Sequence, residues 1–183
     1  MCIRDRYQPL SNELKDYFDV QDKLNETGYL AVGTPGNLMV WAHLVEEYGN
    51  FSLDEVIQPA INIAKNGFRV TDYLSNLIRD NLSELALYKE SAQIYLKNGH
   101  APARGDIIKN PNYAQTLEDI AKHGAAYLYG GELGQHIEDE MSKNGGILTL
   151  DDLKKQQILY REPIVGNYRG YDCLLYTSDA ADE

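Results

Sequence analysis

Histidines and their acidic neighbours are the side chains of this chain that could bind a metal ion. His43 precedes Glu46 by three positions, which puts the pair on one face of a helix. His136 stands in the same way with Asp139 or Glu140, three or four positions on, and two such faces can hold a metal ion when they meet in a helix bundle. Ordinary helical roles explain these histidines better, because His43 flanks an apolar stripe and His123 stands where a helix dipole favours it. We therefore predict no metal site.

Two further patterns could bind or react with a substrate. The acidic runs 138–140 and 151–152 could form a carboxylate pair for glycoside hydrolysis, but helix-surface and capping roles explain both better. The turn 33–36, Gly-Thr-Pro-Gly, could present free amides to an anion at a helix start. Because no Gly-Lys-Ser/Thr follows, a structural turn is the better interpretation. The residue patterns alone therefore show no active site.

The elements that would position these residues are clearest between positions 30 and 70. A helix is expected over 37–48 and ends at Gly49. A second helix opens at Ser52 with a capping box to Glu55, and Gly67 ends it. Pro59 lies inside this helix and should kink it. The first helix is predicted to have one apolar face, and so is the second: Leu38, Trp41, Ala42, Val45 and Tyr48, then Leu53, Val56, Ile57, Ala60, Ile61 and Ala64.

The rest of the chain is also predicted to be mostly helical with short β pieces. Helices are expected over 11–18, 72–87, 112–123, 132–144 and 150–156, with a shorter helical turn over 125–129 and either a helical turn or a strand over 91–96. The helix over 72–87 should turn Leu74, Leu77, Ile78, Leu82 and Leu85 inward. A strand is possible over 29–32, a brief extended piece over 106–108, and a hairpin or two short strands over 162–172.

Composition restricts the classes of function. The 183 residues are 43% hydrophobic and 25% charged, which is typical of a globular protein. The net charge of -11 disfavours nucleic-acid binding, because an acidic surface repels phosphate. No apolar run approaches the roughly 20 residues that a membrane span needs.

Both ends are predicted to be foreign to the protein. Residues 1–6 and the start of 173–183 can be translated from one short DNA element read in opposite directions, as expected of sequencing-adapter sequence. Both cysteines, Cys2 and Cys173, lie in these ends, so no disulfide or thiolate site is expected between them. The domain organisation is then a partial domain over 7–172, an internal piece of a longer protein.

An ordered series of short motifs over 30–172 resembles the large subunit of the gamma-glutamyltranspeptidase family. The series begins with the turn 33–36 and continues through Ala42-His43 and Tyr48-Gly49. Its later members are 58–60, 66–68, 105–106, 116–117, 120–121, 129–131, 145–146, 148–149, 152–153, 161–163 and 166–171. No single motif is specific to this family, but the order of the whole series over some 140 residues is.

This resemblance implies an N-terminal-nucleophile hydrolase with a four-layer αββα fold, of which this piece is mainly the helical part. Such a precursor cleaves itself, and the new N-terminal Thr of the small subunit attacks a gamma-glutamyl amide, with its own amine as general base. The resemblance implies no cofactor. It implies a small gamma-glutamyl substrate such as glutathione, the small subunit as partner, and a periplasmic or extracellular location.

No catalytic, substrate-binding or metal residue is assigned to this chain. In the family, the nucleophilic Thr lies beyond Asp172 and the Arg that holds the substrate carboxylate lies before Tyr7. The threonines at 27, 34, 71, 116 and 149 lack the surrounding motif. The piece alone is expected to be inactive. Two alternatives stay open: a cephalosporin or glutaryl acylase, or a poly-gamma-glutamate-processing relative, on the same scaffold, and a helical binding module without catalysis.

Overall fold

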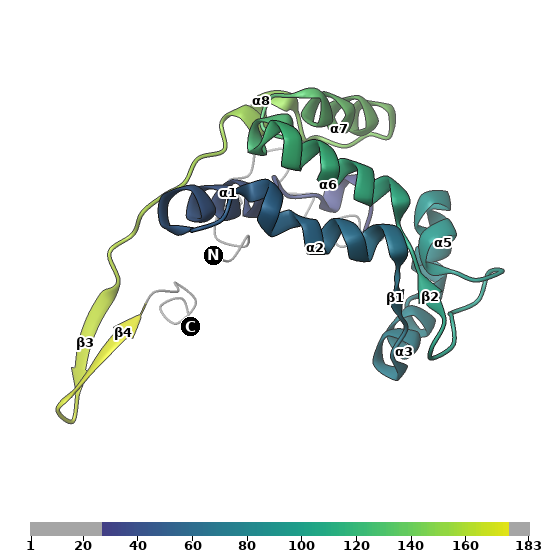
Figure 1. Cartoon of the computed structure of the whole chain (residues 1–183), viewed down its shortest axis with the longest axis horizontal. Helices are drawn as coiled ribbons and strands as arrows, with labels where there is room; N and C mark the ends of the chain where they lie inside the picture. The colour runs from purple at the N-terminus through teal and green to yellow at the C-terminus, as the bar shows by residue number, and fades with distance from the viewer. Residues whose placement is uncertain (1–26, 176–183) are drawn as a thin grey trace, which may run out of the picture. The chain divides into compact units, whose positions relative to one another are not determined.

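The computed structural model describes residues 27–175, and helices dominate this part (Figure 1). The chain contacts divide it into two compact units. The central unit comprises Ala42–Tyr127, and the terminal unit comprises the described residues up to Trp41 and from Leu128 onward. The prediction of a mostly helical chain with short β pieces is confirmed. Within the described residues, no helix combines the length and the apolar character that crossing a membrane requires.

Helices α1 (Asn37–Tyr48) and α2 (Leu53–Asn66) have the predicted bounds. The capping box of α2 is present: the Ser52 amide donates to a Glu55 carboxylate oxygen at 2.9 Å, and the Ser52 hydroxyl donates to the same oxygen at 2.7 Å. The hydrogen bonds from Ser52, the backbone one first, lower the pKa of Glu55 below its ordinary value. At the other end, Gly67 has a φ of 88° and donates its amide to the Ile63 carbonyl at 2.8 Å.

The central unit is built on the packing of α2 along α6 (Pro111–His123), which run side by side in Figure 1. Asn110 caps α6 by accepting from the Tyr113 amide at 3.0 Å. The backbone amide of Asn110 donates to the Ala64 carbonyl at 2.9 Å, which connects the start of α6 to the end of α2. The buried residues of the two helices are Ile61, Ala114, Leu117 and Ile120. A 3-10 turn, η5 (Ala125–Tyr127), follows α6.

Two short antiparallel strands, β1 (Phe68–Arg69) and β2 (Ile107–Ile108), support a second buried cluster in this unit. The cluster consists of Val70, Ile78 and Ile108. The predicted extended piece became β2, whereas β1 was not predicted. Between the strands lie three helices and a loop: α3 (Asp72–Asp80), α4 (Leu82–Leu87), α5 (Lys89–Tyr95) and 96–106.

The single helix predicted over 72–87 is wrong, because the chain breaks at Asn81 between α3 and α4. Asn81 leaves the helical region with φ -108° and ψ 20°, and its side-chain amide donates to the Leu77 carbonyl at 2.8 Å. A short polar side chain that hydrogen-bonds to the backbone competes in this way with helix continuation.

The terminal unit contains η4 (Tyr29–Ala31), α7 (Glu132–Lys143) and α8 (Leu150–Lys154). The strand expected over 29–32 is wrong: Gly28 has a φ of 104°, and the Ala31 amide donates back to its carbonyl at 3.1 Å, which closes a 3-10 turn. The predicted cap of α8 is present, since the Thr149 amide donates to Asp152 at 2.9 Å. The buried cluster of this unit consists of Leu128, Met141, Leu148 and Leu153.

The predicted hairpin is confirmed as β3 (Ile164–Tyr168) paired antiparallel with β4 (Tyr171–Leu175). Its two-residue turn has positive φ at both positions, 52° at Arg169 and 84° at Gly170, as a type I′ turn requires. Both strands lie mostly outside any core, with Ile164, Val165 and Tyr171 all exposed. The helix predicted over 11–18 lies outside the described residues.

The predicted apolar faces are only partly correct. On α2, Ile61 is buried, whereas Val56 and Ala60 are exposed. On α1, Leu38 packs against the cluster of the terminal unit, whereas Trp41 and Tyr48 are exposed. A periodic pattern shows that a side of a helix is apolar, but it does not show which neighbour covers that side. Among the other predicted inward residues, Leu77 on α3 is exposed.

Candidate functional site

The described residues enclose a pocket of about 290 Å³ in the central unit, where β1 leads into α3. Six consecutive or facing residues line it: Arg69, Val70, Thr71, Asp72, Arg104 and Gly105. The backbone builds the pocket by bringing 69–72 against 104–106. The Val70 amide donates to the Asp106 carbonyl, and the Gly105 amide donates to the Val70 carbonyl, both at 2.8 Å.

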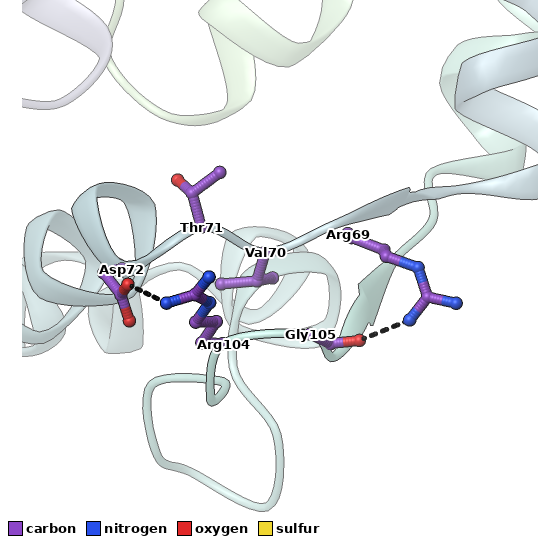
Figure 2. A pocket seen from close by; sticks show the side chains of 6 residues that line it. All are labelled: Arg69, Val70, Thr71, Asp72, Arg104 and Gly105. Carbon is purple, nitrogen blue, oxygen red and sulfur yellow. Dashed lines mark hydrogen bonds and ion pairs between the residues drawn. The ribbon is translucent and has the colours of Figure 1, made fainter.

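The two arginines of this pocket already have partners, as Figure 2 shows. The Arg104 guanidinium donates to the Asp72 carboxylate at 2.8 Å, and both side chains are largely exposed. The Arg69 guanidinium donates to the Gly105 carbonyl at 3.5 Å. Guanidinium groups favour carboxylate and phosphate ligands. Here they instead bond across the pocket, between the segments 69–72 and 104–106.

The side chains of the pocket have structural roles, and they do not form a catalytic centre. Its hydroxyl, Thr71, accepts from the Leu74 amide at 3.2 Å and thereby caps α3. A hydroxyl nucleophile needs a base within hydrogen-bond reach, and the six lining residues supply none other than Asp72, which is paired with Arg104. The sequence predicts no site residue in this region, and no sequence pattern pairs Arg104 with Asp72.

The turn 33–36 is held by a residue that sequence reasoning did not single out, Tyr129. Its hydroxyl donates to the Pro35 carbonyl at 2.8 Å and accepts from the Met39 amide in the first turn of α1 at 3.2 Å. Burial raises the pKa of the Tyr129 hydroxyl, so this group stays protonated and able to donate. The Met39 amide therefore has a protein partner, which agrees with the interpretation of 33–36 as a structural turn.

The acidic runs act as caps and surface pairs, as predicted. Glu138 accepts from the Leu150 amide at 2.9 Å and so secures the start of α8. Asp152 completes the Thr149 capping box, and Asp151 pairs with Lys155 one turn further along. On α7, Lys143 donates to Glu140 at 2.8 Å, and this hydrogen bond lowers the pKa of the Glu140 carboxyl.

Three of the four histidines lie on different helices, and His100 lies in the loop between α5 and β2. His43 is on α1, His136 is on α7, and His123 ends α6, where its ring lies 5.5 Å from that of Tyr127. In the part of the chain that the structure describes, no three His, Cys, Asp or Glu side chains gather in a way that could hold a metal ion.

Comparison with known proteins gives the chain its family. The family model described as gamma-glutamyltranspeptidase matches residues 8–180. The chain belongs to the gamma-glutamyltranspeptidase family. The ordered motif series over 30–172 lies within that match, so the resemblance inferred from the sequence is confirmed.

Individual relatives show how much of the family protein this chain represents. It is 41% identical over 170 residues to the acylase ACY 1 proenzyme of Pseudomonas sp. strain V22, covering 93% of this chain and 30% of that protein. It is 37% identical over 159 residues to the glutathione hydrolase proenzyme of Escherichia coli strain K12, covering 86% of this chain and 27% of that protein. The chain therefore spans less than a third of these relatives' length.

A solved structure agrees with the fold of the described part. The gamma-glutamyltranspeptidase of Helicobacter pylori superimposes with a TM-score of 0.82 at 33% sequence identity, covering 87% of this chain and 46% of that chain. The helix-rich fold with short strands is therefore a fold that this family uses.

Proposed function

We propose that this chain is the helical part of the large subunit of a gamma-glutamyltransferase or glutathione hydrolase-like enzyme. The observation that carries the proposal is the family match over residues 8–180 together with 37% identity to a glutathione hydrolase proenzyme. The whole enzyme would adopt the four-layer αββα fold, with the described helices forming part of an outer layer. The hairpin β3–β4 supports this placement, because strands with exposed apolar residues need a covering layer.

The chemistry would belong to the small subunit of the same precursor. After self-cleavage, its N-terminal Thr would attack the carbonyl carbon of a gamma-glutamyl amide, and the amine of that Thr would accept the hydroxyl proton. The Thr amine would then give that proton to the leaving nitrogen as the amide C–N bond breaks, and the acyl-enzyme would pass the gamma-glutamyl group to water or to an acceptor amine. The residues described here would contribute scaffold, since they bring together no nucleophile and base. A periplasmic or extracellular location belongs to the same proposal and rests on the family alone.

An acylase is the second candidate, because the 41% identical relative is an acylase proenzyme. The two candidates differ in the acyl group that the pocket accepts. A gamma-glutamyl group carries an α-amino group that a glutaryl group lacks, so a site that pairs this amine rejects the analogue strongly.

The test is to express the complete open reading frame that contains this chain. We expect two polypeptides after self-cleavage, the smaller beginning with Thr, and hydrolysis of a gamma-glutamyl anilide faster than of the matching glutaryl anilide. Replacement of that Thr by Ala should leave a single uncleaved and inactive polypeptide. A reading frame that yields an uncleaved wild-type protein would refute the proposal, and a preference for the glutaryl anilide would select the acylase.

A further inference from the structure

Helix α2 has two apolar stripes that lie next to each other on one wide face. The first comprises Leu53, Ile57, Ile61 and Ala64, all buried or half-buried, and Ile61 is 3% exposed in the packing with α6. The second has the spacing i, i+3, i+4, i+7 of one helix face, and we call it the outer stripe. All its members are exposed, with Val56 at 49% and Ile63 at 54%: Val56, Pro59, Ala60 and Ile63.

Helix α1 shows the same arrangement independently. Leu38, Ala42 and Val45 are half-buried, whereas a second row at i, i+3 and i+7 is exposed. That row consists of Trp41, Leu44 and Tyr48, which are 59%, 49% and 72% exposed. Two successive helices therefore each present an uncovered apolar side.

The apolar face of a surface helix is typically little more than about 100° wide, whereas the two stripes of α2 together form a much wider face, which is typical of a helix in a protein interior. The outer stripe thus gives α2 the apolar width of a buried helix, although no residue of the central unit covers it. The cover must come from elsewhere, and the comparisons indicate where: the chain spans 30% and 27% of the lengths of two family proteins. Most of a protein of this family is therefore available to pack on these helices.

We propose that the outer stripe of α2 is an interior contact surface of the complete protein, covered by an apolar segment of the same precursor that lies outside this chain. A second copy of the chain fits less well, because a net charge of -11 opposes self-association. The inference rests on the proposed function only in that both require a longer precursor. It adds which side of which helix that precursor covers.

Thiol accessibility in the complete, wild-type-length protein tests this surface directly. Ile63→Cys places a thiol in the outer stripe, and Asn62→Cys places one at the next, exposed and polar position as a matched control. Val56→Cys repeats the test one turn earlier. Each variant is made in a background without other cysteines and is treated with a maleimide probe in native buffer and in denaturant.

We expect the native Ile63→Cys and Val56→Cys proteins to react at least about tenfold more slowly than Asn62→Cys, because a covered thiol reacts only after local opening. All three should react equally in denaturant. Equal native rates in a protein that sediments as a folded monomer would overturn the inference. Protection that disappears when a dimer is diluted to monomer would also overturn it and would assign the surface to a second copy.

The failure of this inference and that of the proposed function can be told apart. A precursor that shows no gamma-glutamyl activity but protects Ile63→Cys supports the covered surface and removes the function. A precursor that cleaves itself and hydrolyses a gamma-glutamyl anilide, yet leaves Ile63→Cys fully reactive, keeps the function and removes the covered surface.

Discussion

The buried cluster around Leu153 takes Leu128, Met141, Leu148 and Leu153 from one continuous stretch of chain, whereas the cluster around Val70 joins Val70 and Ile78 to the distant Ile108. The first is assembled by α7, a short loop and α8, which the Thr149–Asp152 capping box sets in place. The second depends on the pairing of β1 with β2, two strands of two residues each.

The two clusters should therefore respond differently to substitutions in the side chains and in the backbone. A cluster built from neighbouring helices tolerates a local change as long as the large side chains are kept, because capping and helix propensity hold its elements. A cluster closed by two short, distant strands depends on the close approach of their backbones, where Gly67 lies beside Ile107 and Ile108. Side-chain deletions should therefore affect the first cluster most, and backbone crowding the second.

The largest effect is expected from Leu153→Ala in the terminal unit. Leu153 is 0% exposed, and deletion of a buried Leu side chain costs about 2–5 kcal/mol because a cavity remains. Native-state hydrogen exchange of the complete protein should show faster exchange in α7 and α8 and unchanged exchange in α2 and α6. Leu159→Ala, at an exposed position, is the control and should change stability by less than about 0.5 kcal/mol. Equal acceleration in α6 would contradict two separate clusters.

A smaller effect is expected for the difference in unfolding free energy between Gly67→Ala, in the central unit, and its control Gly124→Ala. Both glycines follow a helix with φ of 88° and 72° and ψ of 170° and -172°, a region almost restricted to glycine, so both substitutions carry a similar backbone cost of about 1–3 kcal/mol. A Cβ at position 67 would also lie 2.7 Å from the Ile108 carbonyl oxygen. A Cβ at position 124 would have no neighbour within 4 Å.

The crowding at position 67 should add about 1–3 kcal/mol to the loss. The measurement is the difference in unfolding free energy between the two variants, together with hydrogen exchange at Val70, whose amide bonds to the Asp106 carbonyl. If the two substitutions cost the same, the β1–β2 contact does not limit the stability of its cluster.

The sequence predicted most helix ends because the signals for them are local. The Ser52–Glu55 and Thr149–Asp152 boxes and the terminal glycines at 67 and 124 each act within one turn of chain. The break at Asn81 was missed because an apolar period continued through it, and only the side-chain bond to Leu77 reveals the competing conformation.

Contacts between distant residues were not predictable in the same way. The Tyr129 hydroxyl bonds to Pro35 and Met39, which are 94 and 90 positions away in the chain, and the pocket pairs Arg104 with Asp72. The exposed side of α2 was likewise unpredictable, because the pattern identifies apolar sides without naming their cover. The foreign origin of 1–6 and 173–183 and the location of the catalytic Thr beyond this chain stay predictions.

The smallest expected effect is the pH dependence that Asp106 gives to the stability of the central unit. It should be confined to the cluster of Val70, Ile78 and Ile108. The hydrogen bond from Lys97, followed by that from the Ala103 amide, holds the pKa of Asp106 below its ordinary value. The folded state therefore binds a proton less readily than the unfolded state, whose pKa is about 3.9. The resulting stabilisation is complete above the unfolded pKa and is lost as the pH falls through the folded pKa.

Asp106→Asn should accordingly lower the stability of the central unit slightly at pH 7 and leave it less sensitive to acid below about pH 4. Asp72→Asn is the matched control, because it removes an exposed ion pair of the same 2.8 Å length without an amide hydrogen bond. Urea unfolding at pH 7 and near pH 3 measures both. Since Asp106 fixes the loop that brings β2 to β1, an Asp106→Asn protein that loses as much stability on acidification as the wild type would show that this loop contributes nothing to the acid response of the cluster.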